Sequence, residues 1–224
     1  MFKRSAVMLA LAALVALGTL ARAAEDKPGS VKKPVAIAHF TDKVVVDGNA
    51  DKWAAIKALP APYSRKDAGM VKLAWREEGL YGYVQVPDDK VNADETNPWA
   101  ADCIELWIEA DFARADDMAG AACQLAIAPN PDSKEGKCYV VVAQGTISAD
   151  AIKATWKKTD KGYALEFFIP ATELKPAKFA EGTKIGLAYA VDDDGKAIEQ
   201  FVADKDTDEG YKSPKTWGAI QFDK

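Results

Sequence analysis

The sequence predicts an all-β protein built as an antiparallel β-sandwich. Short segments of alternating apolar and polar residues recur along the chain, and turn-forming residues separate them at regular spacing. Almost no segment has the periodicity of a helix. Because alternation with period two is typical of strands that bury one face, these observations favour two sheets packed over a common core.

The N-terminal 23 residues predict a secretory signal peptide. Two basic residues precede an apolar run from residue 6 to 20, and Ala-Arg-Ala at 21–23 forms a small-x-small cleavage site. The run is too short to span a bilayer comfortably, so we expect export to the periplasm or the medium, with no membrane span after cleavage. Residues 24–34 are polar and predict a flexible leader, which leaves residues 35–224 as one domain.

The charge balance argues against nucleic acid as a partner. The predicted signal carries three of the 29 basic residues and none of the 34 acidic residues, so the mature chain has a net charge of about −8. No basic stripe is present that would neutralise phosphates.

Three cysteines enter an export pathway in which thiols are oxidised. Cys123 and Cys138 flank a turn-rich stretch, PNPDSKEGK, so we expect them to face each other across a hairpin as a disulfide. Cys103 is then a buried free thiol. No CxxC motif and no Cys/His cluster is present, which argues against structural zinc.

The first part of the domain predicts short strands at residues 35–40 and 43–46, followed by the turn Asp47-Gly48. Oxygen ligands alternate from Asp47 to Asp51, as in calcium loops, but the rest of an EF-hand pattern is absent. We therefore expect a tight turn capped by Asx side chains, with a metal loop as the alternative. We then expect a short helical stretch after Asp51 and a hairpin at residues 70–75 and 80–86.

Residues 97–111, NPWAADCIELWIEAD, contain the most informative strand. Its buried face carries Ile104, Leu106 and Ile108, and its opposite face carries Cys103, Glu105, Trp107 and Glu109. Trp99 arrives from the preceding loop. Aromatic faces beside carboxylates suit sugars, because a pyranose ring stacks on an aromatic and its hydroxyls bind to carboxylates. The alternative is that Trp107 packs under a loop and the glutamates keep the sheet face soluble.

The rest of the chain continues the β pattern. We expect strands at residues 123–128, 139–144, 151–158, 163–169, 184–191, 197–203 and 216–222. Pro170 ends one of these strands, and the following ATELKP predicts one helical turn.

Catalytic groups are scarce. His39 is the only histidine and has no evident nucleophile partner. Glu105 and Glu109 lie four positions apart on one strand, about 13 Å, which exceeds the roughly 5 to 9.5 Å that separates the acid pair of glycosidases. We therefore expect a protein that is not an enzyme.

Six stretches occur in a recognisable order: VVVDGNADKW, VKLAWREEGLYGYVQVPDD, PWAADCIELWIEAD, YALEFFIPATEL, KIGLAYAVDDDG and SPKTWGAIQF. Together they resemble the family 9 carbohydrate-binding module and its DOMON-like relatives, over roughly residues 35–222. The resemblance implies an immunoglobulin-like β-sandwich that binds sugars without catalysis, in association with carbohydrate catabolism. It also implies two aromatics that clamp the sugar ring, and structural calcium.

The resemblance assigns site residues individually. Trp99 matches the clamp tryptophan and Glu105 the hydroxyl-binding acid. The second clamp aromatic matches Tyr211, with Trp217 as the nearby alternative. The predicted ligand-binding set is Trp99, Glu105, Tyr211, Gln124 and Trp107.

Two further family acids match Asp102 and Asp193, which stabilise loops or bind calcium in this interpretation. The sequence also departs from the pattern. Ala190 stands where characterised sugar binders have an amide, and the strand at 123–128 offers Gln124 but no arginine. Fewer polar groups to bind the sugar imply weaker or different binding.

Two alternatives to sugar binding remain. One is an exported interaction or scaffold module that keeps the sandwich without the sugar. The other is haem binding of the DOMON type, for which His39, Met70 and Met118 are the candidate axial ligands.

Overall fold

The structure is a computed structural model that describes residues 33–60, 69–194, 196–200 and 212–224. The predicted signal peptide, most of the predicted leader and Tyr211 lie outside these residues. Within them, no helix is both long enough and apolar enough to cross a membrane.

The described residues form an all-β domain, as predicted. The strands are β1 (Val35–His39), β2 (Met70–Arg76), β3 (Gly79–Pro87), β4 (Cys103–Glu109), β5 (Ala122–Pro129), β6 (Cys138–Gln144), β7 (Lys153–Thr159), β8 (Gly162–Pro170), β9 (Lys184–Asp193), β10 (Lys196–Gln200) and β11 (Gly218–Phe222). Short 3₁₀ turns occur at η1 (Asp51–Trp53), η2 (Pro98–Ala100), η3 (Ala149–Ala151) and η5 (Pro214–Thr216).

Three local predictions are corrected. Residues 43–46 form an irregular segment and not a strand, the helical stretch after Asp51 is only the three residues of η1, and ATELKP forms turns without a helix. In each case the segment is too short for local propensity to fix its backbone.

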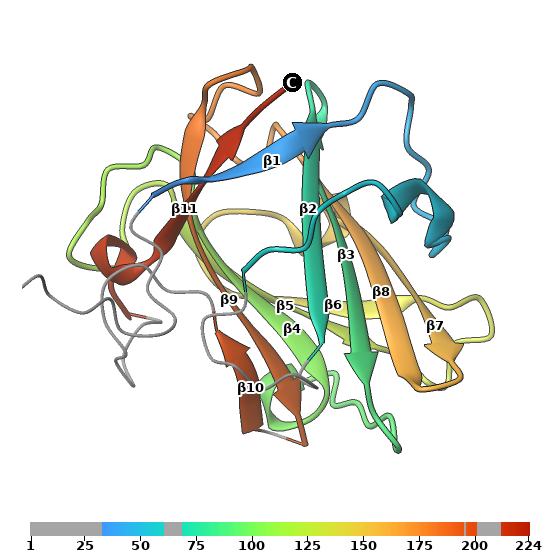
Figure 1. Cartoon of the computed structure of the whole chain (residues 1–224). Helices are drawn as coiled ribbons and strands as arrows, with labels where there is room; N and C mark the ends of the chain where they lie inside the picture. The colour runs from blue at the N-terminus through green and yellow to red at the C-terminus, as the bar shows by residue number, and fades with distance from the viewer. Residues whose placement is uncertain (1–32, 61–68, 195, 201–211) are drawn as a thin grey trace, which may run out of the picture.

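The strands follow one another in a single 11-stranded sheet, β6-β5-β4-β9-β11-β1-β2-β3-β8-β7, with β10 beside β9. The sheet curves back on itself (Figure 1), and a bridge between Lys137 and Thr155 joins the segment before β6 to β7, so the sheet is nearly closed. We call β6, β5, β4, β9 and β11 the β4 half, and β2, β3, β8 and β7 the β8 half.

The first strand corrects the expectation of a wholly antiparallel sheet. β1 runs parallel to β11, with Val35 opposite Ile220, and parallel to β2, with His39 opposite Trp75. Alternating side chains identify a strand but carry no information about its direction relative to its neighbours. β1 therefore connects the two halves.

The core lies between the inner faces of the two halves. It contains Ile104, Leu106 and Ile108 from β4 together with Leu165, Phe167 and Ile169 from β8. The buried face predicted for β4 is confirmed. The outer face of each half carries smaller apolar clusters, which include Trp107 on β4 and Tyr81 on β3.

The predicted disulfide is wrong, because all three cysteines are free thiols. β5 and β6 do form the expected antiparallel pair, but Cys138 lies opposite Pro129. Cys123 is near the other end of β5, six positions and about 20 Å away along the strand. A disulfide requires the two Cα atoms to lie within about 7 Å.

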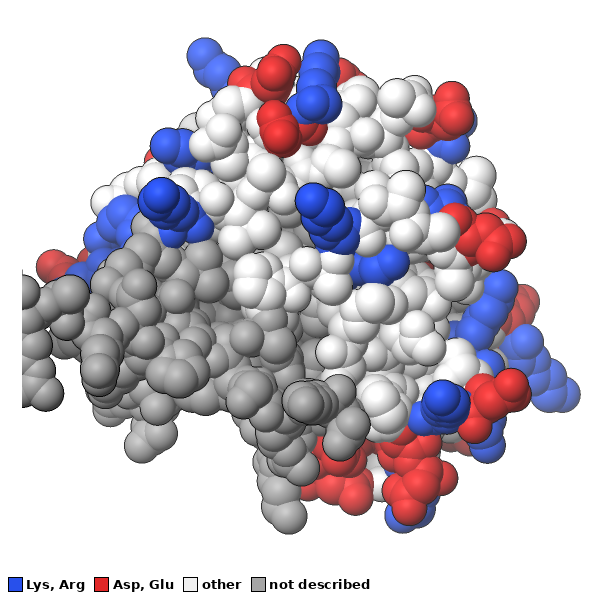
Figure 2. Space-filling view, in the orientation of Figure 1, with Lys and Arg blue, Asp and Glu red and all other residues white. Residues whose placement is uncertain are grey.

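The surface seen in Figure 2 carries acidic and basic side chains interspersed among uncharged ones. On this face the described residues form no continuous basic stripe.

Candidate functional site

The structure places Trp99 on η2, where it is 38% exposed. Pro98 occupies the first position of η2 and is buried, which suits a residue with a fixed φ and no N–H. The carboxylate of Asp94 accepts the backbone N–H groups of Thr96 and Asn97 at 2.9 Å and stabilises the preceding turn. The turn η2, and with it the backbone of Trp99, lies against β4 and β5.

An exposed indole is unusual in this domain. Among the described residues, Trp99 and Val45 are the large apolar side chains that remain exposed. A rigid, partly exposed aromatic is typical of a binding surface.

Glu105 lies on the outer face of β4 and is 9% exposed. Its neighbours across the strands are Ala126 on β5 and Ala190 on β9. The two residues directly opposite Glu105 in the sheet therefore carry only methyl groups.

An amide chain extends from Glu105 across the outer face. The Gln124 side chain donates from Nε2 to Glu105 Oε2 at 2.8 Å. Gln144 in turn donates from Nε2 to Gln124 Oε1 at 3.2 Å. Glu105 and Gln124, which the sequence placed in one site, are thus in direct contact, and Gln144 extends the network to β6.

Asp192 on β9 is a neighbour that the sequence analysis missed. Burial, together with the nearby charge of Glu105, raises the pKa of Asp192 to about 8. Burial also raises the pKa of Glu105, against the opposing effect of the hydrogen bond from Gln124. The Cys103 thiol donates to Asp192 Oδ2 at 3.3 Å. The two carboxyl groups therefore retain a proton near neutral pH.

Trp107 does not form an exposed platform. It is 7% exposed and packs with Ala122, Ala188 and Trp217. The prediction that Trp107 binds ligand is corrected to a packing role, because the small residues on β5 and β9 leave space that its indole fills. Trp217, the alternative second clamp, is fully buried, and Tyr211 lies outside the described residues.

Glu109 supports the fold and not a ligand. It is buried, and its two carboxylate oxygens accept the backbone N–H groups of Arg114 and Ala115 at 2.8 Å each. The Arg114 guanidinium donates to the carbonyl groups of Trp217 and Lys215. Glu109 thus connects the loop after β4 to the segment before β11.

Asp102 stabilises loops, one of the two roles expected for it. Its carboxylate accepts the backbone N–H groups of Asn92 at 2.5 Å and Asp194 at 3.1 Å. Burial raises its pKa to about 6, and the adjacent Asp88 contributes to the rise. Asp193 ends β9 opposite Lys196. In the described ranges no three His, Cys, Asp or Glu side chains converge to hold a metal ion, so calcium stays a prediction.

The segment from Asp47 to Asp51 forms the Asx-capped turn and not a calcium loop. Asp47 Oδ1 accepts the Asn49 N–H at 2.9 Å, and Asn49 Oδ1 accepts the Asp51 N–H at 3.0 Å. Asp47 Oδ1 also accepts from the Lys52 ammonium at 2.6 Å.

The three haem-ligand candidates lie in different environments. His39 Nε2 contacts the Glu77 carboxylate at 3.2 Å, and its ring meets Trp75 edge-on. Met70 packs on the cluster around Trp53, whereas Met118 packs on the cluster around Trp107. They do not converge on one pocket.

Residues 42–224 match the family model described as carbohydrate family 9 binding domain-like. The chain is 24% identical over 188 residues to endo-1,4-beta-xylanase A of Thermotoga neapolitana, an alignment that covers 80% of this chain and 17% of the xylanase. The chain therefore spans less than a fifth of that enzyme's length.

Solved structures share the fold. A family 9 module from Caldicellulosiruptor kristjanssonii in complex with cellotriose has a TM-score of 0.68 at 18% identity, with 85% of this chain and 94% of that chain covered. The same module in complex with glucose gives 0.67 at 19% identity, with 85% and 95% covered. A putative carbohydrate-binding protein from Bacteroides uniformis gives 0.55 at 11% identity, with 85% and 99% covered.

The matched region includes all the described strands from β2 to β11 and every assigned site residue. The chain belongs to the carbohydrate family 9 binding domains, a family of non-catalytic carbohydrate-binding modules.

Proposed function

We propose that the domain binds a β-linked glucose oligosaccharide on the outer face of the β4 half, with Trp99 stacked on one sugar ring. The observation that carries this proposal is the exposed Trp99 on η2, a turn that lies against β4 and β5, the two strands that hold Glu105 and Gln124. Glucose and cellotriose are the sugars bound in the two family 9 structures that share the fold.

The groups at this site have separate roles in the proposal. Trp99 supplies the flat apolar surface, Glu105 accepts hydrogen bonds from sugar hydroxyls, and Gln124 holds the carboxylate in place. Tyr211 is the proposed second aromatic. Because each hydrogen bond contributes about 1 kcal/mol net in water, we expect a weak complex with a Kd of roughly 0.1 to 1 mM.

The test is calorimetric titration with cellotriose. Trp99→Ala is expected to weaken binding at least about tenfold, since exposed aromatics dominate such contacts. Val45→Ala is the matched control, because Val45 is the other exposed apolar side chain and lies on the irregular segment over the β8 half. Unchanged affinity in Trp99→Ala contradicts the proposal.

Wild-type protein that is folded but binds neither cellotriose, glucose nor xylo-oligosaccharides would favour the scaffold alternative. Ala190 is the observation behind that alternative, because its methyl group offers no hydrogen bond to a sugar.

We also propose that the protein is exported and that residues 35–224 form an immunoglobulin-like sandwich of the β4 and β8 halves. Support comes from the signal-like N-terminus and from the apolar core between the two halves. Mass measurement of the mature protein tests export, and a chain that begins at Ala24 is expected. A role beside enzymes of carbohydrate breakdown is supported by the xylanase relative.

A further inference from the structure

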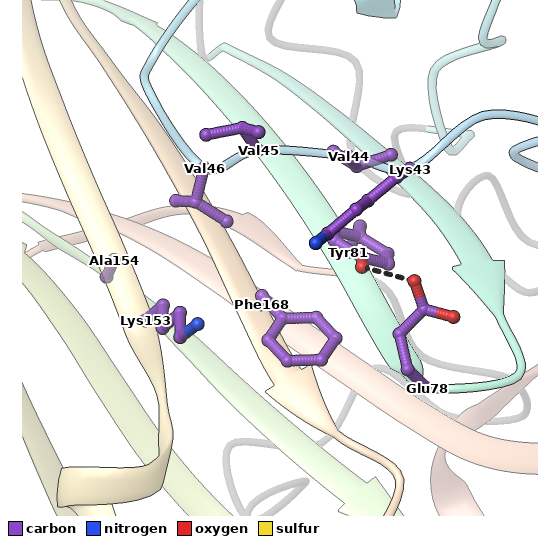
Figure 3. A pocket seen from close by; sticks show the side chains of 9 residues that line it. All are labelled: Lys43, Val44, Val45, Val46, Glu78, Tyr81, Lys153, Ala154 and Phe168. Carbon is purple, nitrogen blue, oxygen red and sulfur yellow. Dashed lines mark hydrogen bonds between the residues drawn. The ribbon is translucent and has the colours of Figure 1, made fainter.

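The outer face of the β8 half carries a pocket of about 490 Å³, and none of the described residues of the proposed sugar site lines it. Its floor is formed by Tyr81 on β3 and Phe168 on β8, and the irregular segment 43–46 passes beside it (Figure 3). The volume lies within the roughly 300 to 1,000 Å³ of small-molecule sites. Neither the family nor the sugar proposal assigns a role to this pocket.

The wall of the pocket is held by a buried carboxylate. Glu166 lies on β8, two positions before Phe168, and is 0% exposed. Its Oε2 accepts the backbone N–H groups of Asp47 at 2.9 Å and Gly48 at 2.7 Å. Lys52 Nζ lies 2.9 Å from Glu166 Oε1 and also donates to the Val45 carbonyl. The segment beside the pocket is therefore fixed before any ligand arrives, which lowers the entropic cost of binding.

The floor is aromatic. The rings of Tyr81 and Phe168 are 4.6 Å apart between centroids and tilted by 35°. Phe168 is half-buried, so part of its ring faces the pocket. A partly exposed aromatic ring supports stacking of a second ring.

The charge at the pocket is positive. Lys43 and Lys153 are exposed and line the pocket, and in Figure 3 the Lys43 ammonium lies next to Tyr81, whereas that of Lys153 lies to the left of the Phe168 ring. Neither takes part in an ion pair with a described residue.

Among the described residues that line the pocket there is one acid, Glu78, and the charge of its carboxylate is offset by a neighbouring cation. Glu78 accepts hydrogen bonds from Arg76 Nε at 2.7 Å and from the Tyr81 hydroxyl at 3.0 Å. Partial burial acts to raise its pKa, but the hydrogen bonds to its carboxylate outweigh burial and lower it. Two ammonium groups thus remain available for an anion.

We propose that this pocket binds a six-membered ring that carries a carboxylate, with the ring on Phe168 and the carboxylate between Lys43 and Lys153. Two kinds of ligand have such a ring: a uronic acid unit of an acidic polysaccharide and an aromatic carboxylate. The pocket would give the domain a second ligand site on the half of the sheet opposite Trp99.

The test titrates wild-type protein with glucuronate, benzoate and glucose and follows the NMR signals of residues 153 and 168. Tighter binding of glucuronate than of glucose supports the uronic acid source, and tighter binding of benzoate supports the aromatic source. Binding of neither carboxylate above the level of glucose overturns the proposal.

Substitutions of the two lysines then test whether they bind the carboxylate. Lys43→Gln and Lys153→Gln are each expected to weaken carboxylate binding about two- to fivefold, as for exposed ion pairs. About 1 M NaCl should weaken it as well, because the Debye length falls to about 3 Å. Lys157→Gln is the matched control, since Lys157 lies on the same face of β7 but does not line the pocket.

Unchanged affinity in the double lysine variant overturns the proposal. So does carboxylate binding that is lost in Trp99→Ala but kept in the double variant, because the anion is then bound at the β4 half. Failure of cellotriose to bind leaves this second site unaffected, so the two proposals are tested separately.

Discussion

Glu105 and Glu166 occupy equivalent positions in the two halves of the sheet, yet their surroundings differ. Each lies on the outer face of a strand that is paired on both sides, β4 for Glu105 and β8 for Glu166. Glu166 accepts hydrogen bonds from the Trp53 indole, from Lys52 and from two backbone N–H groups. Glu105 is bound by the Gln124 amide and lies beside a second acid, Asp192.

The difference separates a structural carboxylate from a candidate ligand group. A buried carboxylate surrounded by donors is satisfied by the protein itself and has no need of a ligand. Burial instead raises the pKa of Glu105, which lies beside a second acid, Asp192, on the strand that follows the exposed Trp99. We infer that Glu166 holds the fold and that the environment of Glu105 is suited to sugar hydroxyls.

The largest expected effect follows removal of the charge of Glu166. Glu166→Gln should lower the free energy of unfolding by about 2 to 4 kcal/mol, because Lys52 loses its buried partner and backbone donors lose an acceptor. Urea denaturation measures the change. A loss no larger than that of Glu105→Gln would remove the distinction between the two glutamates.

Glu109 provides an intermediate case on the same strand as Glu105. Glu109→Gln should destabilise the domain by about 1 to 2 kcal/mol, since an amide oxygen replaces only one of the two acceptors used by Arg114 and Ala115. The same denaturation experiment applies, and cellotriose affinity serves as the control because it should stay within twofold of wild type. Stability equal to wild type would show that the loop does not depend on Glu109.

The acid pair predicts a pH dependence. The pKa of Asp192 is raised to about 8 in the folded state, above the unfolded value of about 3.9. Below about pH 4 this acid is protonated in both states, so it does not affect the free energy of unfolding. As pH rises from about 4 to 8 the unfolded chain ionises first, and the free energy of unfolding therefore falls. Asp192→Asn should raise the free energy of unfolding and the Tm at pH 8, where the unfolded chain ionises this acid more completely than the folded protein does, and should leave both unchanged at pH 4. Thermal denaturation across this range checks it, and a gain that is equal at both pH values contradicts the assignment.

The smallest effect on stability is expected for Glu105 itself. Glu105→Gln keeps the shape of the side chain and removes one charge from the acid pair, so the free energy of unfolding should change by less than about 0.5 kcal/mol. Cellotriose binding should nevertheless weaken several-fold, because a charged acceptor is lost. Calorimetry measures the affinity and urea denaturation the stability of the same sample. A Glu105→Gln protein that is less stable but binds cellotriose as wild type does would give Glu105 the structural role assigned to Glu166.

The sequence predicted the elements around the site better than their partners. Alternation correctly assigned both faces of β4, and Trp99, which was expected to arrive from the preceding loop, is exposed. Glu105 and Glu109 share one face and one pattern, so periodicity could not distinguish a candidate ligand group from an anchor of the Arg114 loop. The distinction depends on the loop after β4, which folds back so that its backbone N–H groups donate to Glu109 and not to Glu105.

Partners distant in sequence were missed for the same reason. Asp192 lies beside Glu105 only because β9 pairs with β4, and Glu166 was not recognised because its donors come from residues 47–53. The disulfide prediction failed on register, since the hairpin of β5 and β6 was foreseen but its alignment was not. Alternation identifies a strand, but the identity of its partners and its exact register also depend on turn geometry and on which faces are buried together.

The parallel insertion of β1 between β11 and β2 has a kinetic consequence. β1 is the first described strand to leave the ribosome, and its neighbour β11 is the last, so the seam between the halves closes only when synthesis of β11 is complete. Such sequence-distant pairing slows folding, because loop entropy is lost before the contact forms. Until then β1 presents an unpaired edge to other chains, and premature termination upstream of residue 218 would leave that edge permanently open to aggregation.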